Sequence, residues 1–173
     1  MPFAWQNAKE ALQTFAIERH FDFLGYAERD NFAAAALERF AANGQTERGT
    51  AVLHRTGTGW TTPRLSSTTM WQHRFITRGE LLPGRLIERY QAIQTSPAPN
   101  VARRPSHGYV AISGIAPLGV SAVVAETSLD SWETSVTESG NFLVVVEAHW
   151  GEEARLFLAI ASGDRVEATG GRL

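Results

Sequence analysis

The sequence predicts an α+β fold, in which an N-terminal antiparallel helix pair packs on an antiparallel, curved sheet or partly closed β-barrel of six to eight strands. Apolar residues recur at three- and four-residue steps in the first 42 residues, and the periodicity changes to that of strands from Gly49. After residue 107, strand-like segments are separated by links of only two or three residues. The 173 residues, 43% of them hydrophobic, suit a single domain over 1–173.

The first predicted helix covers residues 4–20, where Trp5, Ala8 and Leu12 lie on one apolar stripe. A third, short helix is predicted at about 80–94, because "LLPGRLIERY" carries apolar residues at helical steps and its proline fits a first turn.

The second predicted helix covers about 28–42. The segment "FAAAALERFAANG" is rich in strong helix formers, and Asp30 or Asn31 suits its N-cap. Asn43-Gly44 is a common C-terminal stop. The short link to the first helix makes the two helices antiparallel neighbours.

Strands are predicted in the rest of the chain. "GTAVLHRT" and "RLSSTTMWQHRFIT" form an early pair, and a β-meander fills 107–169. The meander strands are "HGYVAISGI", "LGVSAVVAET", "SWETSVTE", "NFLVVVEAHW", "EARLFLAIAS" and "RVEAT". Their short links imply that consecutive strands are antiparallel neighbours, and "FLVVVEA" reads as a central strand covered on both faces.

The composition excludes several classes of protein. The chain has no cysteine, so disulfides, thiolate metal sites and a cysteine nucleophile are absent. Its apolar runs are too short for a transmembrane helix, and the polar residues near the start do not suit a signal peptide. We therefore expect a cytoplasmic protein of bacterial type that does not contact a membrane.

Charge is unevenly distributed along the chain. Residues 1–47 carry a net charge of −3, residues 48–104 a net charge of +7 and residues 105–173 a net charge of −6. The basic middle could face a phosphate or nucleic acid, but neutralisation by the acidic third is the simpler interpretation.

The phosphate-cradling, nucleophile-elbow and zinc-binding motifs that mark common enzymes are missing. The five histidines are scattered, with no pair at helical or alternate-strand ligand spacing. The sequence therefore predicts no metal and no cofactor.

An enzyme acting on a nucleotide or RNA is the main alternative function. A ribonuclease needs a general acid and base beside an arginine that steadies the phosphate. The predicted early strands carry these residue types at His54, Arg55, His73 and Arg74. These residues are candidate catalytic groups only if they converge.

An ADP-ribosyltransferase-like toxin is a second form of this alternative. "VLHRTGTG" followed by "LSSTT" resembles the Arg/His strand and the Ser-Thr-Ser strand of that family over about 20 residues. The family's Glu/Gln-x-Glu is absent from the C-terminal half, where Glu147, Glu152 and Glu153 are the acids on offer. Among these, Glu147 is the candidate catalytic acid. A small-molecule cyclase that works by cavity shape also remains open.

The leading hypothesis is a non-catalytic binding or interaction protein that holds a small apolar ligand or a protein partner. The candidate ligand-binding residues are Trp60, Trp71, Trp132 and Trp150, since aromatic side chains line many ligand cavities. The proline-rich segment 95–107, with Arg103, Arg104 and His107, is a candidate partner-binding loop.

Overall fold

The computed structural model describes residues 5–40, 42–65, 69–71, 91–94 and 107–168. The chain divides into two compact units, unit 1 (1–75) and unit 2 (76–173), which we describe separately. The single domain predicted from the sequence stays a prediction. No helix in the described residues is long and apolar enough to cross a membrane.

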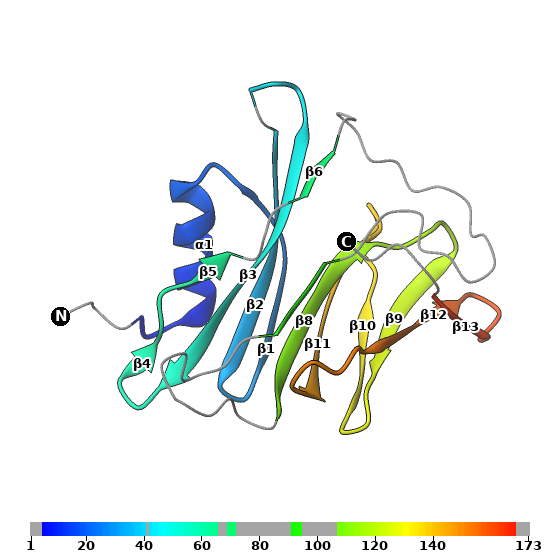
Figure 1. Cartoon of the computed structure of the whole chain (residues 1–173). Helices are drawn as coiled ribbons and strands as arrows, with labels where there is room; N and C mark the ends of the chain where they lie inside the picture. Colours follow the sequence, from blue (N-terminus) through cyan, green and yellow to red (C-terminus); the bar gives the residue numbers. More distant parts are fainter. Residues whose placement is uncertain (1–4, 41, 66–68, 72–90, 95–106, 169–173) are drawn as a thin grey trace. The chain divides into compact units, whose positions relative to one another are not determined.

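Unit 1 is a helix packed on an antiparallel sheet (Figure 1). Its elements are α1 (Ala8–Glu18), β1 (Asp22–Arg29), β2 (Phe32–Phe40), β3 (Thr46–Thr56), β4 (Gly59–Trp60), β5 (Arg64–Leu65) and β6 (Thr69–Trp71). Strands β1 to β4 follow in sequence order, and β5 and β6 both pair with β3. The core lies between α1 and the sheet, with Leu12, Phe15 and Leu53 buried in it.

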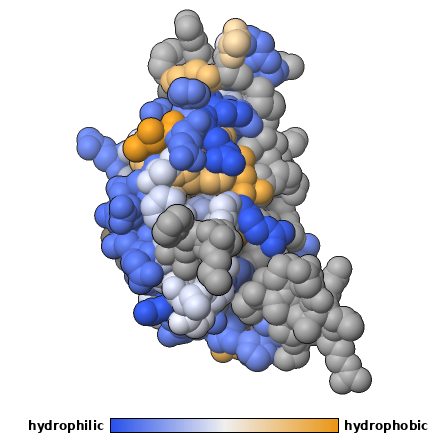
Figure 2. Space-filling view, turned by 90° about the vertical axis from the view of Figure 1, so that its left-hand side faces the viewer, coloured by the Kyte–Doolittle hydropathy of each residue, from blue (hydrophilic) through white to orange (hydrophobic). Residues whose placement is uncertain are grey.

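Helix α1 confirms the first predicted helix, although it begins later. The Asn7 side chain caps it by accepting a hydrogen bond from the Glu10 N–H at 3.0 Å. Trp5 precedes the helix and pairs through its backbone with Trp60. Figure 2 looks onto the side of the molecule where α1 lies in Figure 1, and this side is mainly hydrophilic with small apolar areas.

The predicted second helix is wrong, and with it the predicted helix pair. Residues Phe32–Phe40 form strand β2, and Asp30 and Asn31 lie in the turn between β1 and β2, with Asp30 at a φ of +51°. Residues that suit a helix N-cap suit such turns equally well. Asn43 lies in the next turn, where its side chain accepts the Gln45 N–H at 3.0 Å.

Burial explains why an alanine-rich segment is a strand here. Ala33, Ala35 and Leu37 pack toward α1, and the alternate residues Phe32, Ala34 and Ala36 are buried on the other face of the sheet. Six apolar residues in succession leave no polar face for a surface helix, whereas they suit a strand covered on both faces. Tertiary burial thus overrides helix propensity.

Unit 2 contains two antiparallel sheets. Its strands are β7 (Gln91–Gln94), β8 (His107–Ile115), β9 (Val120–Glu126), β10 (Ser131–Ser135), β11 (Asn141–His149), β12 (Arg155–Ile160) and β13 (Arg165–Glu167). One sheet has the order β11-β8-β7 and the other the order β10-β9-β12-β13. Small aliphatic side chains from both sheets form one core, which includes Ile112, Val123, Val144 and Leu158.

The strand positions after residue 107 are confirmed, but the meander and the partly closed barrel of six to eight strands are wrong. The links of β9 to β10 and of β12 to β13 are hairpins, as predicted. The other short links pass between the two sheets instead, because β8 pairs with β11 and β9 pairs with β12. Strand β11 is buried over Asn141–Val146, yet it is the last strand of its sheet rather than a central one.

The predicted third helix at about 80–94 is wrong at its end, because Gln91–Gln94 form strand β7 and pair with β8. The remainder of that prediction, residues 80–90, lies outside the described residues.

Candidate functional site

His54 and Arg55 lie on opposite faces of β3 in unit 1. The His54 side chain is only 7% exposed, and its ring meets the Phe32 ring edge-on at 5.3 Å between centroids. Arg55 is exposed, as neighbouring residues of a strand point to opposite sides. The two side chains therefore point away from each other.

The buried environment of His54 keeps its imidazole neutral. Burial, with a smaller contribution from the charge of Arg64, lowers the pKa of His54 from 6.5 to about 4. The His54 backbone N–H donates to the Thr61 hydroxyl at 3.0 Å. In the folded chain at neutral pH, His54 is an uncharged core residue.

Several other predicted site residues lie beyond the described side chains. His73, Arg74, Arg103 and Arg104 fall outside the described residues, and of Trp71 only the backbone pairing with Thr46 is described. Their convergence or use stays a prediction. Trp60 is 4% exposed and belongs to the core beneath α1, so its indole packs within the protein.

Unit 2 brings distant polar and aromatic residues to one end. His107 at the start of β8 is paired with His149 at the end of β11. Glu126 at the end of β9 is paired with both Ser131 and Arg155, which begin β10 and β12. We call residue 107 together with 126–132 and 147–153 the acidic end.

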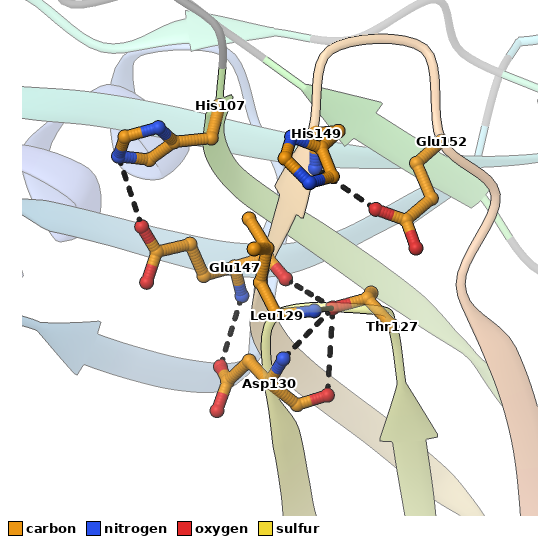
Figure 3. A network of polar contacts seen from close by, with 7 residues as sticks. All are labelled: His107, Thr127, Leu129, Asp130, Glu147, His149 and Glu152. Atoms are coloured by element: carbon orange, nitrogen blue, oxygen red, sulfur yellow. Dashed lines mark hydrogen bonds and ion pairs between the residues drawn. The ribbon is translucent and has the colours of Figure 1, made fainter.

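A hydrogen-bonded turn organises the acidic end (Figure 3). The Asp130 carboxylate accepts the backbone N–H of Glu147 at 3.0 Å, and the Thr127 hydroxyl donates to the Glu147 carbonyl at 2.5 Å. Thr127 also accepts the N–H groups of Leu129 and Asp130, at 3.2 and 3.1 Å. The turn 127–130 is therefore fixed both within itself and to β11.

Glu152 ties the next turn to the same structure. Its carboxylate accepts the Ser128 N–H at 2.6 Å, the Ser128 hydroxyl at 2.9 Å and the His149 N–H at 3.0 Å. Hydrogen bonds from the Ser128 and His149 backbones lower the pKa of Glu152. Asp130 and Glu152 thus serve to hold backbone groups of neighbouring segments.

Among the described residues, His107 and Glu147, which were selected from the sequence for different hypotheses, lie side by side. Their Nε2 and Oε1 atoms are 3.2 Å apart, and both side chains reach solvent. Figure 3 shows the Glu147 side chain directed toward His107 while its backbone N–H faces Asp130. Two residues 40 positions apart therefore meet because β8 and β11 pair in this register.

Exposed apolar side chains accompany these carboxylates. Leu129 in the turn and Trp132 at the start of β10 are 44% and 46% exposed. The acidic end contains five carboxylates and no lysine or arginine of its own, although Arg165 of β13 forms an ion pair with Glu126 at 3.5 Å. The carboxylates are Glu126, Asp130, Glu147, Glu152 and Glu153. The surface here combines apolar contact area with negative charge.

The sequence did not reveal the role of the residues that organise this end. Asp130 and Glu152 lie in segments that the sequence marks as short links, and Thr127 is the last residue of a predicted strand. Glu152 was named only as a possible catalytic acid. Their signal was a Thr-Ser-Leu-Asp turn, since Thr, Ser and Asp side chains bond nearby backbone groups. Leu129, an apolar residue between polar turn residues, was the signal of an exposed contact.

Comparison of the chain with protein families, with curated proteins and with solved structures finds no match. The functional argument therefore depends on the chain's own residues.

Proposed function

We propose that this chain is a non-catalytic binding protein that holds a protein partner at the acidic end of unit 2. The partner presents an extended or looped segment in which lysine or arginine stands beside an apolar side chain. One observation carries the proposal: exposed Leu129 and Trp132 lie at the acidic end, which holds five carboxylates, of which Glu126 is ion-paired with Arg165.

The apolar part of this surface suits a contact that contributes most of the binding free energy. Tryptophan is enriched at interface positions where truncation to alanine costs about 2 kcal/mol or more. Trp132 pairs with Ala125 on β9, so its backbone is held by the sheet while half of its side chain reaches solvent. We therefore expect Trp132 to be the main anchor.

The turn 127–130 favours binding because it is already ordered before a partner binds. Thr127 and Asp130 bond the turn to β11, and Glu152 bonds it to the following turn. A surface that is ordered before the partner arrives loses less conformational entropy on association. Leu129 is thus presented in one position.

The carboxylates suit a cationic partner and give selectivity. Charges at the rim of an interface steer association and disfavour partners of like charge. Because these carboxylates are near the surface, their attraction weakens as salt rises. The enzyme alternative stays a prediction, since it depends on His73 and Arg74 as well as on His54 and Arg55.

Selection from a phage-displayed library of random heptapeptides tests this proposal. We expect the native chain to enrich peptides that combine lysine or arginine with an apolar residue. Trp132→Ala should lose those peptides, whereas Ile17→Ala should keep them, because Ile17 is an exposed apolar residue of α1 in unit 1. Enrichment of acidic or uncharged peptides, no enrichment, or equal retention by Trp132→Ala would contradict the proposal.

A further inference from the structure

Strands β10 and β11 of unit 2 are consecutive in the chain and lie close together, yet they belong to different sheets. Among the residues that the structure describes, β10 has a backbone ladder only with β9, and β11 has one only with β8. We call the boundary between β10 and β11 the seam.

The hydrogen-bond pattern shows which backbone groups of β10 face away from β9. The Thr127 N–H donates to the Asp130 carbonyl at 2.9 Å, and the Val136 N–H donates to the Ser121 carbonyl at 3.0 Å. Because bonding alternates along an antiparallel pair, the backbone groups of Glu133 and Ser135 point away from β9.

The same reasoning applies to β11. The Ala116 N–H donates to the Gly140 carbonyl at 2.8 Å, so the groups of Leu143 and Glu147 point away from β8. In the described part of unit 2, no ladder pairs these groups with those of β10.

Side chains close the two ends of the seam. At the acidic end, Asp130 accepts the Glu147 N–H and Thr127 donates to the Glu147 carbonyl. At the other end, the Thr137 N–H donates to the Asn141 carbonyl at 2.9 Å, and the Asn141 N–H donates to the Thr137 hydroxyl at 3.0 Å. The Thr137 end is also held covalently, since it is the link between the strands.

We propose that unit 2 opens along the seam and that Thr127 and Asp130 are its latch. Opening breaks the hydrogen bonds of Thr127 and Asp130 to Glu147 and no backbone ladder, whereas separating two strands within either sheet breaks the ladder between them. It gives solvent access to core residues of β11 such as Val144, which is 0% exposed in the closed unit. The latch belongs to the turn that carries Leu129, so a partner bound there acts directly on the opening.

Thiol labelling tests the seam, because the chain has no cysteine of its own. A single cysteine is introduced as Val144→Cys on β11 or as Leu158→Cys on β12, both at positions that are 0% exposed. Strand β12 has ladders on both sides, with β9 and β13. We expect Cys labelling by a water-soluble maleimide to be about tenfold faster at 144 than at 158 under native conditions.

The latch is tested by adding Asp130→Ala to each cysteine variant. Loss of a hydrogen bond to a charged acceptor should speed labelling at 144 about tenfold or more and change labelling at 158 by less than about twofold. Asp130→Asn, which keeps an acceptor oxygen, should give an intermediate rate, and circular dichroism confirms that each variant is folded. Equal labelling rates at 144 and 158, or equal acceleration of both by Asp130→Ala, would overturn the proposal.

Discussion

His54 makes the stability of the chain depend on pH. Burial lowers its pKa to about 4 in the folded chain, against 6.5 for an unperturbed histidine. As the pH falls, His54 is therefore protonated near pH 6.5 in the unfolded chain but only near pH 4 in the folded chain. The contribution of neutral His54 to the free energy of unfolding is fully present above pH 6.5. It is lost as the pH falls from 6.5 toward about 4.

Between about pH 7.5 and about pH 4.5, this linkage lowers the free energy of unfolding by about 2 kcal/mol, with allowance for solvent screening. Carboxylates also begin to titrate in that range, so the informative quantity is a difference between two chains. His54→Gln removes the titrating group. When the pH falls over the same range, the free energy of unfolding of this variant should therefore decrease by about 2 kcal/mol less than that of the native chain.

Urea unfolding followed by tryptophan fluorescence at both pH values measures this difference. His54→Gln is less stable than the native chain at about pH 7.5 and approaches it at about pH 4.5. Parallel losses of stability in the two chains would refute the assignment of a buried, neutral His54.

Three further predictions concern unit 1. Leu12→Ala, in the core beneath α1, should lower the free energy of unfolding by about 3 kcal/mol in urea, whereas Ile17→Ala, on the exposed side of the helix, should change it by less than about 0.5 kcal/mol. Asn7→Ala should cost about 1 kcal/mol through the lost cap, measured as a lower thermal midpoint. Asp30→Gly should raise that midpoint slightly, because glycine adopts the positive φ of this turn without strain. A higher thermal midpoint for Asn7→Ala would contradict the role of Asn7 as the helix cap. A lower midpoint for Asp30→Gly would contradict the strain assigned to Asp30 in the turn.

Local patterns predicted strands β8 to β13 of unit 2 and the first helix of unit 1. Alternation and short links located β8 to β13, since those signals come from residues adjacent in the chain. The pairing of these strands did not follow, because a two-residue link can join two neighbours in one sheet or pass from one sheet to the other. Which of these occurs is decided by the joint burial of residues such as Val144 and Leu158.

In the alanine-rich segment, a strong local preference for helix predicted a helix over about 28–42, whereas Phe32–Phe40 form strand β2. Nothing within residues 28–42 reveals that α1 covers one side of Ala33 and Ala35. Burial of both faces of β2 depends on partners elsewhere in the chain, and it outweighs the few tenths of a kcal/mol per residue that helix propensity supplies.

The candidate site was predictable by residue type more than by arrangement. His107, Glu147 and Trp132 were selected from the sequence, but as members of three separate hypotheses. Their common location follows from the register of β8 with β11 and from the Asp130 bond to Glu147. Register is set by contacts between strands far apart in sequence, so no local pattern contains it.

Isothermal titration of an enriched basic, apolar heptapeptide into the whole chain tests the binding proposal most directly. We predict that the affinity falls as NaCl is raised from about 50 mM to about 300 mM, because the carboxylates of the acidic end contribute attraction that salt screens. We also predict that Trp132→Ala weakens binding about 30-fold or more at either salt concentration, whereas Ile17→Ala leaves it unchanged. An affinity that is independent of salt and equal in the native and Trp132→Ala chains would contradict binding at the acidic end.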